Sequence, residues 1–155
     1  MVWKPHVTVA ALVEREGRFL MVEEKDGAHI VYNQPAGHLD EGEGLTDAVV
    51  RETFEETAWQ FRPTSIIGIY RWMNPHNRHT YLRVCFNGVC EKHDAARRLD
   101  KGIVRALWLT RGELLELGPR LRSPMVLRCV DDYLAGKHYP LELLNELDGE
   151  WPPAL

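Results

Sequence analysis

The chain has 155 residues, and its 23 Asp and Glu against 19 Lys and Arg give a formal net charge of −4. The length and a hydrophobic content of 45% predict a single domain, residues 1–155, with one ordinary core. The acidic balance argues against nucleic acid as the main partner. No apolar run approaches the roughly 20 residues of a membrane-spanning helix, so no membrane partner is expected.

The cysteines and the N-terminal segment indicate the cellular compartment. Cys85, Cys90 and Cys129 are odd in number and form no C-x-x-C pair. Residues 1–17 lack the basic and then apolar pattern of a secretory signal. These features predict a reduced, cytoplasmic protein. The sequence favours neither a monomer nor a homodimer.

Strands dominate both halves of the predicted structure. Apolar and β-branched runs separated by turn residues predict strands at 7–13, 19–22, 29–32, 65–72, 80–89 and 103–109. The glycine-rich stretch 33–44 and the charged stretch 91–102 are expected to be loops, and the tail 148–155 is expected to be irregular.

Three helices are expected among these strands. The predicted helices span residues 45–58, 113–117 and 124–134. Thr46 is the expected N-cap of the first, and Pro63 excludes its continuation. Ser123 and Pro124 are the preferred residues for starting the last helix, and Gly136 closes it. The order of elements predicts a mixed sheet with helices on both faces, which is an α/β (α+β) class, and not a doubly wound parallel sheet.

Acidic residues are concentrated on the first helix and the loop before it. Residues 40–56 hold seven acidic side chains and one basic one, Arg51. Glu52, Glu55 and Glu56 stand at positions i, i+3 and i+4, so their carboxylates share one helical face although like charges there repel. Oxygen-only ligands suit Mg²⁺, with Mn²⁺ as a substitute. Arg51 is expected to pair with one carboxylate; the alternative for the whole face is a solvated acidic surface.

The spacing of these residues resembles the Nudix box, G-x5-E-x7-R-E-U-x-E-E-x-G-U, where U is a bulky aliphatic residue. The first glycine and every charged position of the box match. Thr53 replaces the usual aliphatic residue and Ala58 replaces the second glycine. The stretches NQPAGHL, RWMNP, LRSP and YPLE, between residues 33 and 142, are similar to the NudJ-type subgroup of Nudix phosphatases.

The resemblance implies a fold, an activity and a set of site residues. It implies an α/β/α sandwich with a central mixed β-sheet, and Mg²⁺-dependent hydrolysis of nucleoside di- and triphosphates and of thiamin or hydroxymethylpyrimidine pyrophosphates. The implied metal ligands are Glu52, Glu55, Glu56, Glu43 and the carbonyl of Gly37. The implied catalytic residues are Glu56, Glu55 and Arg51, which orients a glutamate. Asp100 is a second candidate for the general base.

Substrate contacts are less clearly marked in the sequence. Trp72 ends a predicted strand beside a polar loop and is a candidate for ring stacking, although strand aromatics usually fill the core. Asn33 and Gln34 precede the box and are candidates for hydrogen bonding, although loop polar residues are usually just solvated. Basic side chains that are candidates for phosphate contacts are Lys4, Arg71, Arg83 and Arg122. Arg122 stands just before a helix N-terminus, which attracts anions.

Three other functions remain open at the level of sequence. One is a pyrophosphatase for ADP-ribose or dinucleotides, because the box specifies the reaction and not the leaving group. Another is pyrophosphohydrolysis at RNA 5′ ends, which the acidic composition disfavours. The last is a non-catalytic Nudix-fold nucleotide sensor, which usually lacks box glutamates that are all present here.

Overall fold

The computed structural model describes residues 1–149 and 152. Its strands are β1 (His6–Leu12), β2 (Glu14–Arg15), β3 (Arg18–Asp26), β4 (His29–Asn33), β5 (Ala36–His38), β6 (Trp59–Met73), β7 (Thr80–His93) and β8 (Ile103–Thr110). Its helices are α1 (Leu45–Thr57), α2 (Arg111–Leu117) and α3 (Pro124–Leu134), with 3-10 turns at Gly118–Arg120 and Leu141–Leu143. In the predicted tail, Asp148 and Gly149 are irregular, and residues 150, 151 and 153–155 lie outside the described part.

The strands form two sheets where the sequence predicts one. The first sheet has the order β5-β1-β7-β6 and is mixed, because β1 runs parallel to β7 and antiparallel to β5. The second sheet has the order β2-β3-β4 with β8 paired to β3, and it is antiparallel. Strand β3 cannot pair with β1, because β5 and β7 already take both edges of β1.

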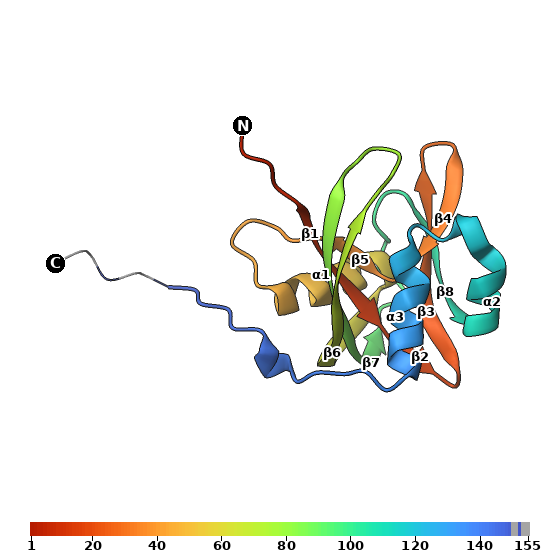
Figure 1. Cartoon of the computed structure of the whole chain (residues 1–155). Coiled ribbons are helices and arrows are strands. Elements are labelled where there is room, and N and C mark those ends of the chain that lie inside the picture. The colour runs from red at the N-terminus through yellow and green to blue at the C-terminus, as the bar shows by residue number, and fades with distance from the viewer. Residues whose placement is uncertain (150–151, 153–155) are drawn as a thin grey trace.

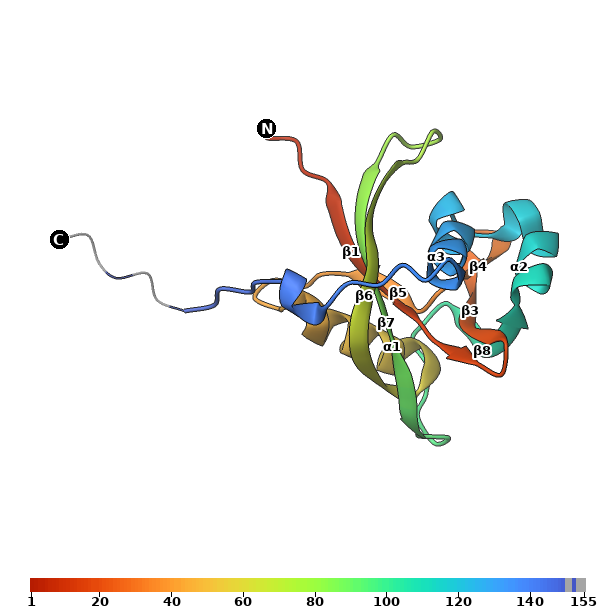
Figure 2. The ribbon, with the colours of Figure 1, turned by 60° about the horizontal axis from the view of Figure 1, so that its bottom comes forward.

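Helices cover both faces of the first sheet, which confirms the α/β/α sandwich (Figure 1). Alternate residues of β1 belong to different cores. Val9 and Ala11 pack with Val49 of α1, whereas Ala10 and Leu12 pack with Val126 of α3. Figure 2 shows α2 and α3 on the side of the second sheet, away from α1. The core on the α1 face also includes Leu20 of β3 and Trp108 of β8, so α1 packs against residues of both sheets.

Several element boundaries differ from the prediction. Ala36–His38 form the short strand β5 inside the stretch expected to be irregular. Strands β6 and β7 extend well beyond the predicted ends, so the first residues of the expected charged loop belong to β7. Pro63 lies inside β6, where the pairing register with β7 shifts. No helix in the described part of the chain is long and apolar enough to cross a membrane.

The ends of α1 are also not as predicted. Gly44, and not Thr46, is the N-cap residue, and it has no capping side chain. The carboxylate of Glu146, from the C-terminal segment, accepts hydrogen bonds from the backbone N–H groups of Leu45 at 2.7 Å and Thr46 at 3.4 Å. At the other end Ala58 has a left-handed conformation with φ 62°. This positive φ explains why the Nudix box has a glycine at this position.

Candidate active site

The loop between β5 and α1 brings the acidic helix against the edge of the first sheet. Strand β5 pairs with β1 through Gly37 and Val9. A Cβ atom added at Gly37 would lie 2.0 Å from Cδ of Glu52. A side chain at this position would have to displace the carboxylate of Glu52, so the first glycine of the pattern allows that carboxylate to approach the backbone of β5.

Arg51 holds the carboxylates of the loop and the helix together. Its guanidinium donates to both oxygens of Glu43, at 2.7 and 2.9 Å, and to Glu52 at 2.8 Å and Glu55 at 3.1 Å. It also donates to the backbone carbonyl of His38. The hydrogen bond from Arg51 holds the pKa of Glu43 below its usual value. Arg51 therefore pairs with more carboxylates than the one expected. Its partners on the helix are Glu52 and Glu55, and the folded loop adds Glu43.

Glu56 occupies a different environment on the same helix. It is 7% exposed, and its Oε1 accepts a hydrogen bond from the backbone N–H of Ala36 at 2.7 Å. Burial raises the pKa of Glu56 to about 9, with further repulsion from Glu24, Glu52 and Asp100. Three carboxylates thus add negative charge around one that is almost out of water, and a cation would relieve this repulsion.

The donor chemistry of the cluster fits a divalent cation, because all of its side-chain donors are carboxylate oxygens. Within residues 1–149 and 152, however, no three His, Cys, Asp or Glu side chains are grouped closely enough to hold one ion. Glu43, Glu52 and Glu55 instead point to Arg51, the positive charge among them. Binding a cation therefore requires some of these glutamates to exchange Arg51 for the ion.

A polar pocket of about 260 Å³ opens next to Gly37, on the side of the sheet that faces α3. Four of the predicted substrate residues line it, and these are Asn33, Trp72, Arg83 and Arg122. The other residues that line the pocket are Thr8, Glu24, Asp26, Ala36, Gly37, His38, Asn74, Asn77, Tyr81, Ser123 and Met125. The pocket therefore joins the glutamate side of the molecule to a group of basic and aromatic side chains.

Three of the predicted substrate residues, Gln34, Lys4 and Arg71, lie outside this pocket. Gln34 is 1% exposed, and both ends of its amide are bonded, with Nε2 donating to the carbonyl of Val126 at 2.7 Å and Oε1 accepting from Arg83 at 2.9 Å. Gln34 therefore holds Arg83 in position through its hydrogen bond and does not face the pocket. Lys4 is exposed near the N-terminus and lines none of the pockets in the described residues.

Glu24 is a pocket residue that the sequence analysis missed. It lies on β3, its carboxylate accepts from Arg122 at 3.1 Å, and burial raises its pKa. No sequence pattern around Glu24 distinguishes it, because it is one of several charged residues at the end of a strand. Only the pairing of the second sheet brings Glu24 towards Glu56.

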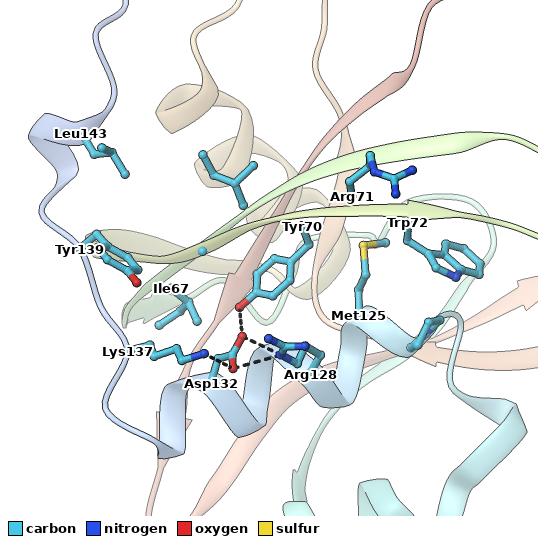
Figure 3. A pocket seen from close by; sticks show the side chains of 13 residues that line it. Ile67, Tyr70, Arg71, Trp72, Met125, Arg128, Asp132, Lys137, Tyr139 and Leu143 are labelled. Atoms are coloured by element: carbon cyan, nitrogen blue, oxygen red, sulfur yellow. Dashed lines mark hydrogen bonds and ion pairs between the residues drawn. The ribbon is translucent and has the colours of Figure 1, made fainter.

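A second, larger groove of about 680 Å³ runs between β6 and α3. Figure 3 shows Tyr70 pointing from β6 to Asp132 of α3, which also accepts from Arg128 and Lys137. The Tyr70 hydroxyl lies 2.8 Å from Asp132. Trp72 and Met125 line both this groove and the polar pocket. Trp72 thus forms the wall between the two spaces.

Comparison with known proteins assigns a family to this architecture. The NUDIX domain family matches residues 4–129. Phosphatase NudJ from Escherichia coli (strain K12) is 37% identical over 150 residues, covering 97% of this chain and 95% of the relative. A NUDIX hydrolase from Nitrosomonas europaea is 46% identical in sequence, covers 95% of this chain and 100% of its own, and superposes with a TM-score of 0.92.

A more distant solved structure shows the fold alone. The NUDIX domain of Shewanella oneidensis NrtR, complexed with ADP ribose, is 16% identical with a TM-score of 0.68, covering 86% of this chain and 90% of its own. The family match and the two closer relatives each extend over most of the chain. The chain belongs to the Nudix family and is a Nudix hydrolase.

Proposed function

We propose that this protein hydrolyses phosphoanhydride bonds in nucleoside di- and triphosphates and in thiamin-type pyrophosphates, including hydroxymethylpyrimidine pyrophosphate, with Mg²⁺ as its cofactor. The observation that carries the proposal is the glutamate cluster around Arg51, which lies beside a pocket lined by arginine side chains. Similarity to Phosphatase NudJ over most of the chain supports the substrate class. The three free and buried cysteines suit the reducing cytoplasm in which we place the enzyme.

Each residue of the cluster has a proposed role. Glu52, Glu55 and Glu56 hold the cation, with Glu43 and the carbonyl of Gly37 completing its surroundings. A divalent cation bound there neutralises phosphate oxygens and lowers the pKa of the attacking water.

The remaining steps depend on protein side chains. Arg51 orients the glutamates, because its guanidinium reaches Glu43, Glu52 and Glu55 at once. Glu56 is the proposed proton acceptor, with Asp100 as the second candidate, because a carboxylate outside tight metal bonding can take the proton of the attacking water. Positioning and charge stabilisation supply most of the catalysis of such a transfer.

A substrate panel tests the proposal. The purified protein is assayed with Mg²⁺ or with EDTA on thiamin pyrophosphate, hydroxymethylpyrimidine pyrophosphate, nucleoside di- and triphosphates, RNA with a 5′-triphosphate and ADP-ribose, and phosphate and pyrophosphate are measured separately. We expect Mg²⁺-dependent turnover of the first groups and none with EDTA. Fast cleavage of ADP-ribose alone would contradict the substrate class, and no turnover of any compound would indicate a nucleotide sensor.

A further inference from the structure

Arg83 is a buried guanidinium without a carboxylate partner. It lies on β7 and is 4% exposed. Its Nη1 donates to Oε1 of Gln34 at 2.9 Å, and its Nη2 donates to Oδ1 of Asn33 at 3.1 Å. None of the ion pairs found in residues 1–149 and 152 includes Arg83. Two neutral amides therefore hold a full positive charge that has left water, beside the buried thiol of Cys129, whose pKa is lowered by its hydrogen bond with Cys85 and by Arg83.

The guanidinium also has an unused donor. The Nε atom of Arg83 is buried and has no hydrogen-bond partner in the described residues. Burying a charge is strongly unfavourable unless it is paired, and an unused donor adds to this cost. Gln34 fixes the position of Arg83, because the other end of its amide donates to the carbonyl of Val126. The molecule therefore holds an unneutralised cation in a defined place, which is the arrangement expected where a ligand supplies the anion.

The polar pocket gives this cation access to a ligand. Arg83, Arg122, Thr8 and Ser123 all line it. Oγ1 of Thr8 is buried and has no partner in the described residues, so it is a second unused polar group. Thr8 pairs with Arg83 in the register of β1 and β7, which places both on the same face of the sheet. The first turn of α3 contributes Ser123 and Met125 to the same wall, and a helix N-terminus favours anions.

The charges around the pocket are distributed unequally. The charge of Arg122 is balanced by Glu24, which accepts from it at 3.1 Å. Asp26 also lines the pocket, but it forms none of the ion pairs found in the described part of the chain. Arg83 is therefore the positive group that a bound anion would neutralise.

We propose that Arg83 binds a phosphoryl group of the substrate in the polar pocket, with the hydroxyl of Thr8 as an additional partner. This inference rests on the proposed function, and it names Arg83 as a residue that determines which substrates the hydrolase binds. Asn33 and Gln34 are positioning residues in this arrangement, since they hold Arg83. Substrates without a phosphoryl group that reaches Arg83 should bind weakly, whichever bond is cleaved.

The test compares Arg83→Met with wild type and with Arg62→Met, a matched arginine on β6 that is exposed and paired with Glu91. Melting temperatures are measured in EDTA with and without inorganic phosphate, and the Nε–H signal of Arg83 is followed by NMR during the same titration. We expect phosphate to shift this signal and to raise the melting temperature of wild type and Arg62→Met, but not that of Arg83→Met. We expect Arg83→Met to be as stable as wild type or more stable without phosphate, because an unpaired buried charge has been removed.

Steady-state kinetics with Mg²⁺ give the second readout. Arg83→Met should raise KM about tenfold to a hundredfold, as expected for the loss of hydrogen bonds to a charged group, with kcat changed much less. Arg83→Lys should recover part of the loss. The inference fails if phosphate neither shifts the Nε–H signal nor separates the variants, or if Arg83→Met unfolds at lower temperature with KM unchanged. The phosphate titration needs no turnover, so it tests Arg83 even if the proposed function fails.

Discussion

Helix α3 starts with its own cap, whereas helix α1 receives one from the other end of the chain. The side chain of Ser123 accepts from the backbone N–H of Met125 at 3.2 Å, and Pro124 follows in the first turn. Helix α1 has no capping side chain of its own, and it carries three glutamates on one turn. Glu146 supplies its cap.

The difference shows which helix is specified by local sequence. Ser123 and Pro124 favour the start of α3, so that boundary follows from neighbouring residues. In α1 three glutamates repel one another. Arg51 of the same helix pairs with them and with Glu43 of the preceding loop, and Glu146 of the C-terminal segment supplies the cap. The glutamate-rich helix α1 therefore depends on tertiary contacts for its stability.

Substitution of the α1 glutamates should have the largest effect. Glu55→Gln and Glu56→Gln should each lower kcat at least about 100-fold, because each removes a charged oxygen proposed to act in the chemical step. The matched control is Asp47→Asn, an exposed acidic residue in the first turn of the same helix. Steady-state rates with Mg²⁺ and circular dichroism spectra check activity and fold together. Near wild-type turnover in both glutamine variants would remove α1 from the mechanism.

The pH dependence of the free energy of unfolding should show how much the buried carboxylate of Glu56 destabilises the fold, apart from its proposed role in catalysis. The pKa of Glu56 is about 9 in the folded protein against 4.5 normally. Between these values the unfolded chain releases a proton that the folded protein keeps, so stability falls as pH rises. In EDTA, Glu56→Gln should therefore stabilise the protein, by up to about 3 kcal/mol at pH 7.

Chemical denaturation in EDTA at pH 4 and pH 7 measures this effect. Near pH 4 both states of wild type hold the proton, so the gain from Glu56→Gln should disappear there. An equal gain at both values, or a loss at pH 7, would show that Glu56 is charged and well solvated in the folded protein.

The two caps should contribute similar amounts although they come from different distances. Ser123→Ala and Glu146→Ala should each lower the free energy of unfolding by about 1 kcal/mol. Glu142→Ala, an exposed acidic residue in the same C-terminal segment, is the control for Glu146. Urea unfolding gives the free energies, and amide hydrogen exchange at Leu45 should accelerate about fivefold only in Glu146→Ala. Unchanged exchange there would mean that water replaces Glu146 without loss.

The C-terminal end of α1 should show the smallest effect. Ala58→Gly relieves about 1–2 kcal/mol of strain from the left-handed backbone conformation. It also removes a buried methyl group, which contributes about 0.8 kcal/mol, and it raises the conformational entropy of the unfolded chain. The net change in the free energy of unfolding should lie within about 1 kcal/mol of zero. Ala58→Val should cost clearly more, because a branched side chain tolerates positive φ poorly. Similar unfolding curves for Gly and Val variants would contradict the strain at Ala58.

Local patterns in the sequence predicted the parts of the structure that depend on near neighbours. Ser123 and Pro124 correctly marked the start of α3 because capping involves residues two positions apart. The shared face of Glu52, Glu55 and Glu56 follows from helical geometry alone. The long spacing from the first glycine through the glutamates predicted the family, which the comparisons confirm.

Contacts between distant segments were not predictable in the same way. The division into two sheets depends on which strands occupy the edges of β1, and no short pattern reports this. Glu146 as the cap of α1 involves residues 101 positions apart. The pocket around Arg83 depends on β1, β4, β7 and α3 meeting, so the sequence marked Arg83 only as one of several basic candidates.

The cap from Glu146 has a consequence for the order of events during synthesis. Chains emerge from the ribosome at about 5–20 residues per second, so α1 leaves the ribosome several seconds before Glu146 does. Through that interval the first turn of the helix has no protein partner for the N–H groups of Leu45 and Thr46. The glutamate helix therefore reaches its full stability only after Glu146 has been made.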